Sequence, residues 1–134
     1  MTQEKVVRLL IYYTDAGCIE KVVSAFRKLL IDVNWIWGRR IDSLYEIYLG
    51  VEEHPNLKLA LLNLCKTVGI EYVELLLDAR IERYAYLNGE FKKVAESNNI
   101  SENIYRDSNH FIIYVPTYTR MAGCKWGEKY GENI

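Results

Sequence analysis

The stretch Thr14-Asp15-Ala16-Gly17-Cys18-Ile19 is a polar turn between two apolar runs, and the predicted fold is built around it. The run before it, Val6 to Tyr13, is short and rich in β-branched and aromatic residues, which predicts a strand. From Ile19 to Leu30 apolar residues recur three and four positions apart, which predicts a helix with one buried face. Backbone N–H groups at such a helix start can bind a carboxylate or phosphate. We therefore expect part of any ligand site here, with Asp15 as the helix N-cap.

The segments that follow complete a regular alternation of strands and helices. Ile31 to Trp37 and Ser43 to Val51 alternate apolar and polar residues, and the short connection between them predicts an antiparallel hairpin. In the first of these strands the alternation places Ile31, Val33, Trp35 and Trp37 on one face. A second amphipathic helix is expected from Leu57 to Val68, ended by Gly69, and Ile70 to Leu77 is predicted to be a strand.

This order predicts an α+β fold of the ferredoxin-like βαββαβ type over residues 1–79, a four-stranded antiparallel sheet with two helices on one face. Residues 80–134 are expected to form a C-terminal α/β extension that packs on the first unit or on a second subunit. Within it, Arg80 to Leu87 and His110 to Val115 are predicted strands, and Glu90 to Glu96 a short helix.

Composition argues against several classes of function. The chain has 134 residues, half of them apolar, and a net charge of −1, so binding to nucleic acid through phosphate neutralisation is not favoured. It has no apolar run long enough for a membrane span and no signal-peptide layout at its start, so we expect a cytoplasmic protein. Cys18, Cys65 and Cys124 lack the spacing of a disulfide framework or zinc site, and we expect no metal or cofactor.

Residues 6–77 resemble an ACT domain, and more narrowly the N-terminal half of acetolactate synthase small (regulatory) subunits. The residues that carry the resemblance are the turn and, after it, Glu20-Lys21-Val22 and Phe26. At this turn the family typically reads Asn-Glu-Pro-Gly-Val-Leu, followed by an apolar helix stripe. Gly17 matches, while Thr14, Ala16 and Cys18 take the places of the Asn, Pro and Val.

The resemblance implies a non-enzymatic regulatory protein that forms a homodimer or a larger homo-oligomer. It implies a small effector, an amino acid, bound at a subunit interface, and a biosynthetic enzyme such as acetolactate synthase as the regulated partner. The site would take residues of the turn from one copy and residues of the second-strand region from the other. The implied effector-binding residues are Thr14, Asp15, Ala16, Gly17, Cys18, Ile19, Val33 and Asn34.

A second hypothesis is an oligomerisation or protein-interaction module of the same fold with no small ligand. The aromatic residues Trp35, Trp37, Tyr45 and Tyr48 on the predicted hairpin are typical of interface centres. They could also stack on RNA bases, but the signature of RNA-recognition modules is absent.

An enzyme is the least favoured hypothesis. The face of the sheet without helices would carry Glu46 and Glu74 with no convergent histidine or nucleophile. Cys18, near a helix start, is either a reactive thiol or an inert buried one, and no histidine or asparagine partner is evident nearby.

Overall fold

The structure is a computed structural model that describes residues 4–87, 89–94 and 111–125. The chain divides into two compact units. The first consists of Met1–Asp78 and Thr119–Ile134, and the second of Ala79–Tyr118. The stretch predicted as one C-terminal extension therefore contributes to both units.

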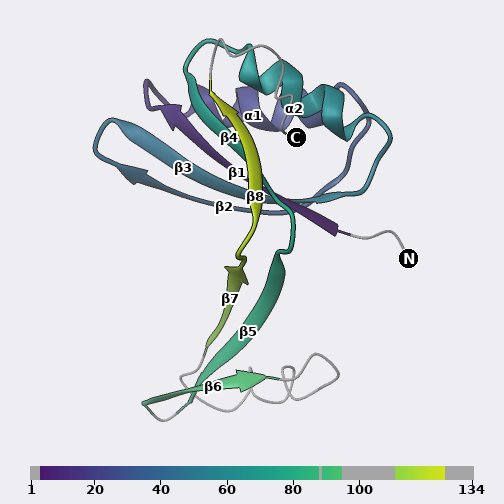
Figure 1. Cartoon of the computed structure of the whole chain (residues 1–134). Coiled ribbons are helices and arrows are strands. Elements are labelled where there is room, and N and C mark those ends of the chain that lie inside the picture. The colour runs from purple at the N-terminus through teal and green to yellow at the C-terminus, as the bar shows by residue number, and fades with distance from the viewer. Residues whose placement is uncertain (1–3, 88, 95–110, 126–134) are drawn as a thin grey trace. The chain divides into compact units, whose positions relative to one another are not determined.

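The first unit is an α+β structure with a five-stranded antiparallel sheet in the order β2-β3-β1-β4-β8. Both helices lie on one face of this sheet (Figure 1). The arrangement is compatible with a ferredoxin-like fold to which one strand has been added. Its elements are β1 (Glu4–Tyr12), α1 (Gly17–Arg27), β2 (Val33–Ile41), β3 (Leu44–Glu52), α2 (Leu57–Cys65), β4 (Ile70–Leu76) and β8 (Met121–Lys125).

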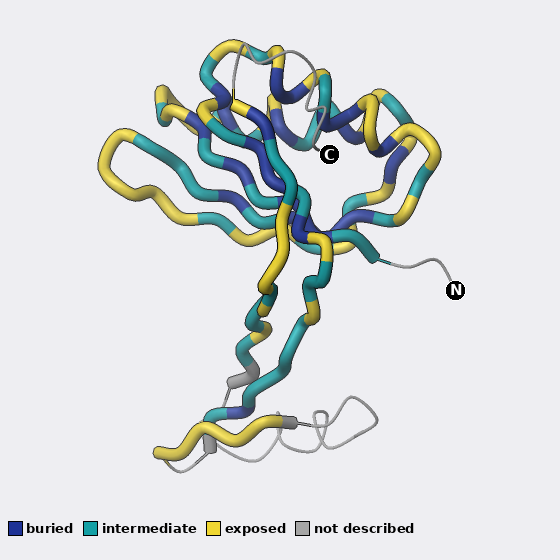
Figure 2. The backbone as a smooth tube through the Cα atoms, viewed as in Figure 1, coloured by how far each residue is buried: buried dark blue, intermediate teal, exposed yellow. Residues whose placement is uncertain are grey.

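The core lies between the sheet and the two helices (Figure 2). Phe26 of α1 and Leu61 of α2 are fully buried there, as the three- and four-residue spacing of the helix stripes predicts. From the sheet, Leu9 and Leu49 pack against them, because alternate residues of β1 and β3 point to the helix side. Burial of this apolar area is the main term that stabilises the unit.

The hairpin of β2 and β3 is longer than predicted, because Gly38 to Ile41 continue β2 and only residues 42 and 43 form the turn. The predicted facing of β2 is wrong in part. Val33 lies opposite Val51, but Trp35 lies opposite Gly50, so a bulge at this point adds one residue to β2. The extra residue places Val33 on the helix side and Trp35 on the other, since directly opposed residues share a face.

The two helices are shorter than predicted. α1 ends at Arg27, and Leu30 follows with a φ of 59° and a side chain that is 83% exposed. α2 ends at Cys65, so Val68 lies outside the apolar stripe and is 72% exposed. Gly69 has a φ of 98°, the left-handed conformation that favours glycine, and it stands between the end of this helix and β4.

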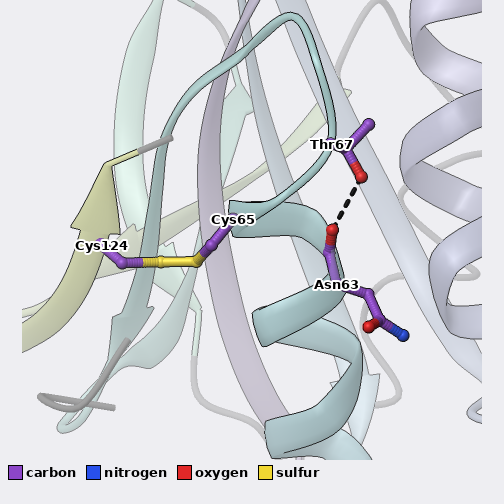
Figure 3. The surroundings of a disulfide bond; sticks show 4 residues. All are labelled: Asn63, Cys65, Thr67 and Cys124. Atoms are coloured by element: carbon purple, nitrogen blue, oxygen red, sulfur yellow. Dashed lines mark hydrogen bonds between the residues drawn. A yellow bond between two sulfur atoms is a disulfide. The ribbon is translucent and has the colours of Figure 1, made fainter. Parts of the chain in front are cut away.

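A disulfide joins Cys65, the last residue of α2, to Cys124 of β8 (Figure 3). The two Cα atoms are 6.3 Å apart and the cysteines are separated by 59 residues in the chain. The expectation that the cysteines form no disulfide is therefore wrong for this pair. The spacing rules missed it because the pairing of β8 with β4 brings the two residues together.

The side chain of Asp78, which follows β4, binds the segment that directly precedes β8. Asp78 Oδ1 accepts hydrogen bonds from the backbone N–H groups of Thr119 and Arg120, both at 2.9 Å, and Oδ2 accepts one from the Thr119 hydroxyl. The Thr119 side chain and these N–H groups lower the pKa of Asp78 to about 2. These bonds hold the chain just before β8 against the end of β4.

The second unit is a three-stranded antiparallel sheet in the order β6-β5-β7. Its strands are β5 (Arg80–Leu87), β6 (Glu90–Val94) and β7 (Phe111–Thr117). The prediction of a short helix from Glu90 to Glu96 is wrong for residues 90–94, which form β6; residues 95 and 96 lie outside the described residues. Gly89, with a φ of 83°, allows a tight turn from which Glu90 to Val94 pair with β5 instead. His110, the predicted start of the following strand, lies outside the described residues.

Neither of the helices in the described part of the chain has the length and apolar character that a membrane span requires.

Candidate functional site

The turn between β1 and α1 satisfies its own backbone groups. Asp15 Oδ1 accepts a hydrogen bond of 2.7 Å from the N–H of Gly17, and the Asp15 carbonyl accepts one of 3.1 Å from Cys18. The N–H of Ile19 donates to the carbonyl of Ala16 at 3.1 Å. The N-cap is Ala16, and Asp15 precedes it, so the predicted N-cap position was off by one residue. The N–H groups of residues 17 to 19 therefore already have acceptors.

The exposed charge of the turn is the Asp15 carboxylate. Its Oδ1 atom is held by Gly17, and a Cβ added at Gly17 would lie only 2.7 Å from that oxygen. A larger residue at position 17 would therefore displace the Asp15 carboxylate from this position. Because this carboxylate occupies the place that a bound anion would take, the turn itself favours a cationic group such as an ammonium.

The side chain of Arg40, a residue that the sequence analysis did not single out, lies over the residue that precedes this turn. The guanidinium carbon of Arg40 lies 4.3 Å from the ring centroid of Tyr13, which directly precedes the turn. The Tyr13 ring stacks on Tyr45 at 5.8 Å, and the N–H of Tyr13 donates to the carbonyl of Ser43 at 2.9 Å. Arg40 Nε donates to the carbonyl of Asp42 at 3.1 Å. The contacts of Tyr13 with Arg40, Ser43 and Tyr45 join residues far apart in sequence, so no local pattern reveals them.

Val33 and Asn34 do not lie near the turn within one chain. The turn follows Tyr12, which pairs with Leu44 at one end of β3, whereas Val33 pairs with Val51 near the other end. Asn34 Nδ2 donates to the carboxylates of Glu4 at 2.9 Å and Glu52 at 3.0 Å. A site that includes these residues and the turn requires two copies of the chain, as the resemblance implies.

Cys18 is a free, buried cysteine. Burial raises the pKa of its thiol, and the negative charge of Asp15 raises it further. The thiol is therefore held in the protonated form, which is a poor nucleophile. Its 2% exposure places it in the core cluster rather than at a reactive surface.

The sheet face without helices carries an ion network at its centre. Arg8 donates to Glu46 Oε2 through Nε at 3.0 Å and Nη2 at 2.5 Å, and to Glu74 Oε2 through Nη1 at 3.1 Å. Burial lowers the pKa of Arg8, but the bonds and charges of the two glutamates outweigh that effect and raise it overall. The two acidic residues expected on this face are thus paired with a cation, which sequence reasoning did not identify.

Three of the four predicted aromatic residues lie on this same face, and Tyr45 does not. Trp37 contacts Tyr48 with ring centroids 5.8 Å apart, and Arg8 lies 5.8 Å from the centroid of Tyr48. Trp35 covers Gly50, where an added Cβ would meet the indole, and its Nε1 donates to Glu4 at 2.8 Å. The Trp37 side chain is 51% exposed at the β2 edge of the sheet. We call the side chains of Arg8, Trp35, Trp37, Glu46, Tyr48 and Glu74 the open-face cluster.

On the opposite side of the unit, α1 and α2 enclose a groove of about 370 Å³. It contains none of the residues of the predicted effector site. The groove is lined by Lys21, Ser24, Ala25, Lys28, Leu29, Asn63 and Thr67.

Comparisons of the chain with protein-family models, with curated proteins and with solved structures give no match.

Proposed function

We propose that this protein is a non-enzymatic regulatory module of the ACT type that binds an amino acid at the boundary between two copies of the chain and modulates a biosynthetic enzyme. The observation that carries the proposal is the turn at the end of the central strand β1, where the exposed Asp15 carboxylate binds the Gly17 N–H and the guanidinium of Arg40 lies over the ring of Tyr13, which directly precedes the turn. The strand order β2-β3-β1-β4, with both helices on one face, supports the finer assignment to a ferredoxin-like ACT domain.

The chemistry of the turn indicates how an amino acid would be held. The ammonium group would pair with Asp15, whose second carboxylate oxygen is not used by Gly17. The carboxylate would pair with Arg40, whose Nη atoms make no bond to Asp42. Asn34 and Val33 would come from the second copy. Pairing of two copies along β2 suits the charges of that edge, since an antiparallel match centred on Ile36 would place Arg40 of one copy opposite Asp32 of the other.

Binding of valine, leucine or isoleucine at millimolar concentration is expected to raise the unfolding temperature of the protein, since a ligand that binds only the folded state stabilises it. Asp15→Asn should abolish this shift by removing the charge that holds the ammonium group. The measurement is a thermal-shift titration of both proteins. Glu53→Gln is the matched control, because it removes one exposed carboxylate outside the turn, where Glu53 pairs only loosely with Lys5 at 3.9 Å, and it should leave the shift in place.

The outcome that counts against effector binding is an unfolding temperature that no proteinogenic amino acid changes in the wild-type protein. Amine analogues that lack the carboxylate separate the two halves of the site. If such an amine raises the unfolding temperature of the wild-type protein and of Arg40→Gln by the same amount, the ligand is held by Asp15 alone.

A second candidate function is an assembly module without a small ligand, and the exposed apolar side chain of Trp37 on an unpaired edge strand favours it. Aromatic residues of this kind are frequent energetic centres of protein interfaces. Trp37→Glu is expected to convert a dimer or larger oligomer into monomers in size-exclusion chromatography with light scattering. Leu59→Glu is the matched control, since Leu59 is 47% exposed on α2 and distant in sequence from β2. A wild-type protein that is monomeric at high concentration would contradict both candidate functions.

A further inference from the structure

The side chain of Arg83 ends in a guanidinium group, and the edge of this group formed by Nε and Nη2 has no hydrogen-bond partner in the part of the chain that the structure describes. Arg83 lies on β5, the central strand of the second unit, directly opposite Tyr114 of β7. Its Nε and Nη2 atoms are buried and have no hydrogen-bond partner. A guanidinium cannot escape this situation by losing its proton, because it stays charged at any pH that proteins tolerate.

Unpaired buried donors on a permanent cation carry a free-energy cost that native proteins avoid. The first unit shows the usual solution. Arg8 uses the same two atoms, Nε and Nη2, to bind the Glu46 carboxylate. Arg83 therefore has the donor geometry of Arg8 without the oxyanion that completes it.

The carboxylates of the second unit that the structure describes do not supply this partner. Glu82 points to the other face of the sheet, since it neighbours Arg83 in the strand, and it accepts bonds from Tyr84 at 2.7 Å and Lys93 at 3.2 Å. Glu90 lies opposite Leu87, four residues along β5 from Arg83. Lys92 lies opposite Ala85 and so shares the face of Arg83, where it adds a second positive charge.

We propose that Arg83 anchors a binding site for a small oxyanion, a carboxylate or a phosphate monoester, in the second unit of the chain. The Nε–H and Nη2–H groups donate to two oxygens of the ligand, the side-on geometry in which guanidinium groups bind such anions. Lys92 adds electrostatic attraction on the same face. This site is independent of the turn between β1 and α1, so it stands or falls separately from the proposed function.

The test follows the Nε–H resonance of Arg83 by NMR in the full-length protein labelled with ¹⁵N. The resonance is assigned by its loss in Arg83→Lys. Titration with inorganic phosphate and, separately, with succinate at constant ionic strength is expected to shift it saturably with at least one of the two, while sodium chloride does not. The two probes distinguish a phosphate ligand from a carboxylate ligand.

Variants show whether Arg83 carries the binding. Arg83→Gln is expected to weaken binding of the active probe at least about tenfold, as followed on backbone resonances of the second unit. Arg83→Lys keeps the charge but loses the two-pronged edge, so it should weaken binding as well, and it serves where Arg83→Gln does not fold. Arg80→Gln is the matched control, with the same loss of charge on the same strand and the other face. Equal affinity in the Arg83 variants, or no saturable shift with either probe, would overturn the proposal.

Discussion

Replacement of Cys124 by alanine is expected to lower the free energy of unfolding of the oxidised protein by about 4 kcal/mol. The disulfide closes a loop of 59 residues between α2 and β8. In the chain-entropy view, a loop of this length restricts the unfolded chain by roughly that amount. It is also a covalent link between β8 and the helix layer of the first unit, so its loss should weaken the pairing of β8 with β4.

Urea denaturation of the wild-type protein and of Cys124→Ala, both without reductant, measures the effect. Reduction of the wild-type protein with dithiothreitol should produce a loss of similar size, while it should change the stability of Cys124→Ala very little. Cys18→Ala is the matched control, since Cys18 is equally buried but free. A wild-type protein whose stability does not respond to reductant would show that the bond is absent in solution.

Replacement of Arg8 by methionine is expected to destabilise the first unit by about 3 kcal/mol. The carboxylates of Glu46 and Glu74 are only 16% and 7% exposed, and without Arg8 they would face each other with no cation. Removal of one partner from a buried ion network leaves an uncompensated charge and costs more than the network itself contributes.

The same argument predicts that neutralising both glutamates restores the stability lost in Arg8→Met. This recovery distinguishes the effect of the unpaired charges from the effect of lost packing. The triple variant Arg8→Met, Glu46→Gln, Glu74→Gln should recover most of the lost stability, because no charge is left unpaired. Glu53→Gln is the control, since Glu53 forms an exposed pair with Lys5 at 3.9 Å and should change the stability by less than about 0.5 kcal/mol. Chemical denaturation of the four proteins provides the values, and a triple variant no more stable than Arg8→Met would contradict the explanation.

The open-face cluster and the candidate effector site differ in how they depend on other molecules. The ion network of Arg8 is complete within one chain, because both glutamates are bonded to its guanidinium. The turn, by contrast, has an exposed carboxylate and a neighbouring arginine, and its predicted partners Val33 and Asn34 lie at the other end of the sheet. Assembly therefore comes before effector binding in the proposed mechanism, and a ligand would shift the balance between assemblies by its difference in affinity for them.

Local patterns in the sequence were enough for five of the first six elements, and the exception is β2, whose predicted facing was wrong in part. Apolar spacing predicted β1, α1, β3, α2 and β4, because each of these elements buries one face against the same core and must repeat with its own period. The glycine turn was also recognised, although its chemistry was not. The Asp15 carboxylate already binds the Gly17 N–H, which a sequence pattern does not reveal.

The sequence by itself therefore determined the order of the first six elements and the position of the turn between β1 and α1. It did not determine β6, which was predicted as a helix, or β8. Only the tertiary structure decided the bulge that turns Trp35 to the open face, the pairing of Arg8 with two glutamates, and the addition of β8 through Cys124. The physical reason is separation along the chain. Periodicity indicates only which side of its own element a residue faces. These contacts join residues between 15 and 66 positions apart, and they form only when the sheet brings the strands into register.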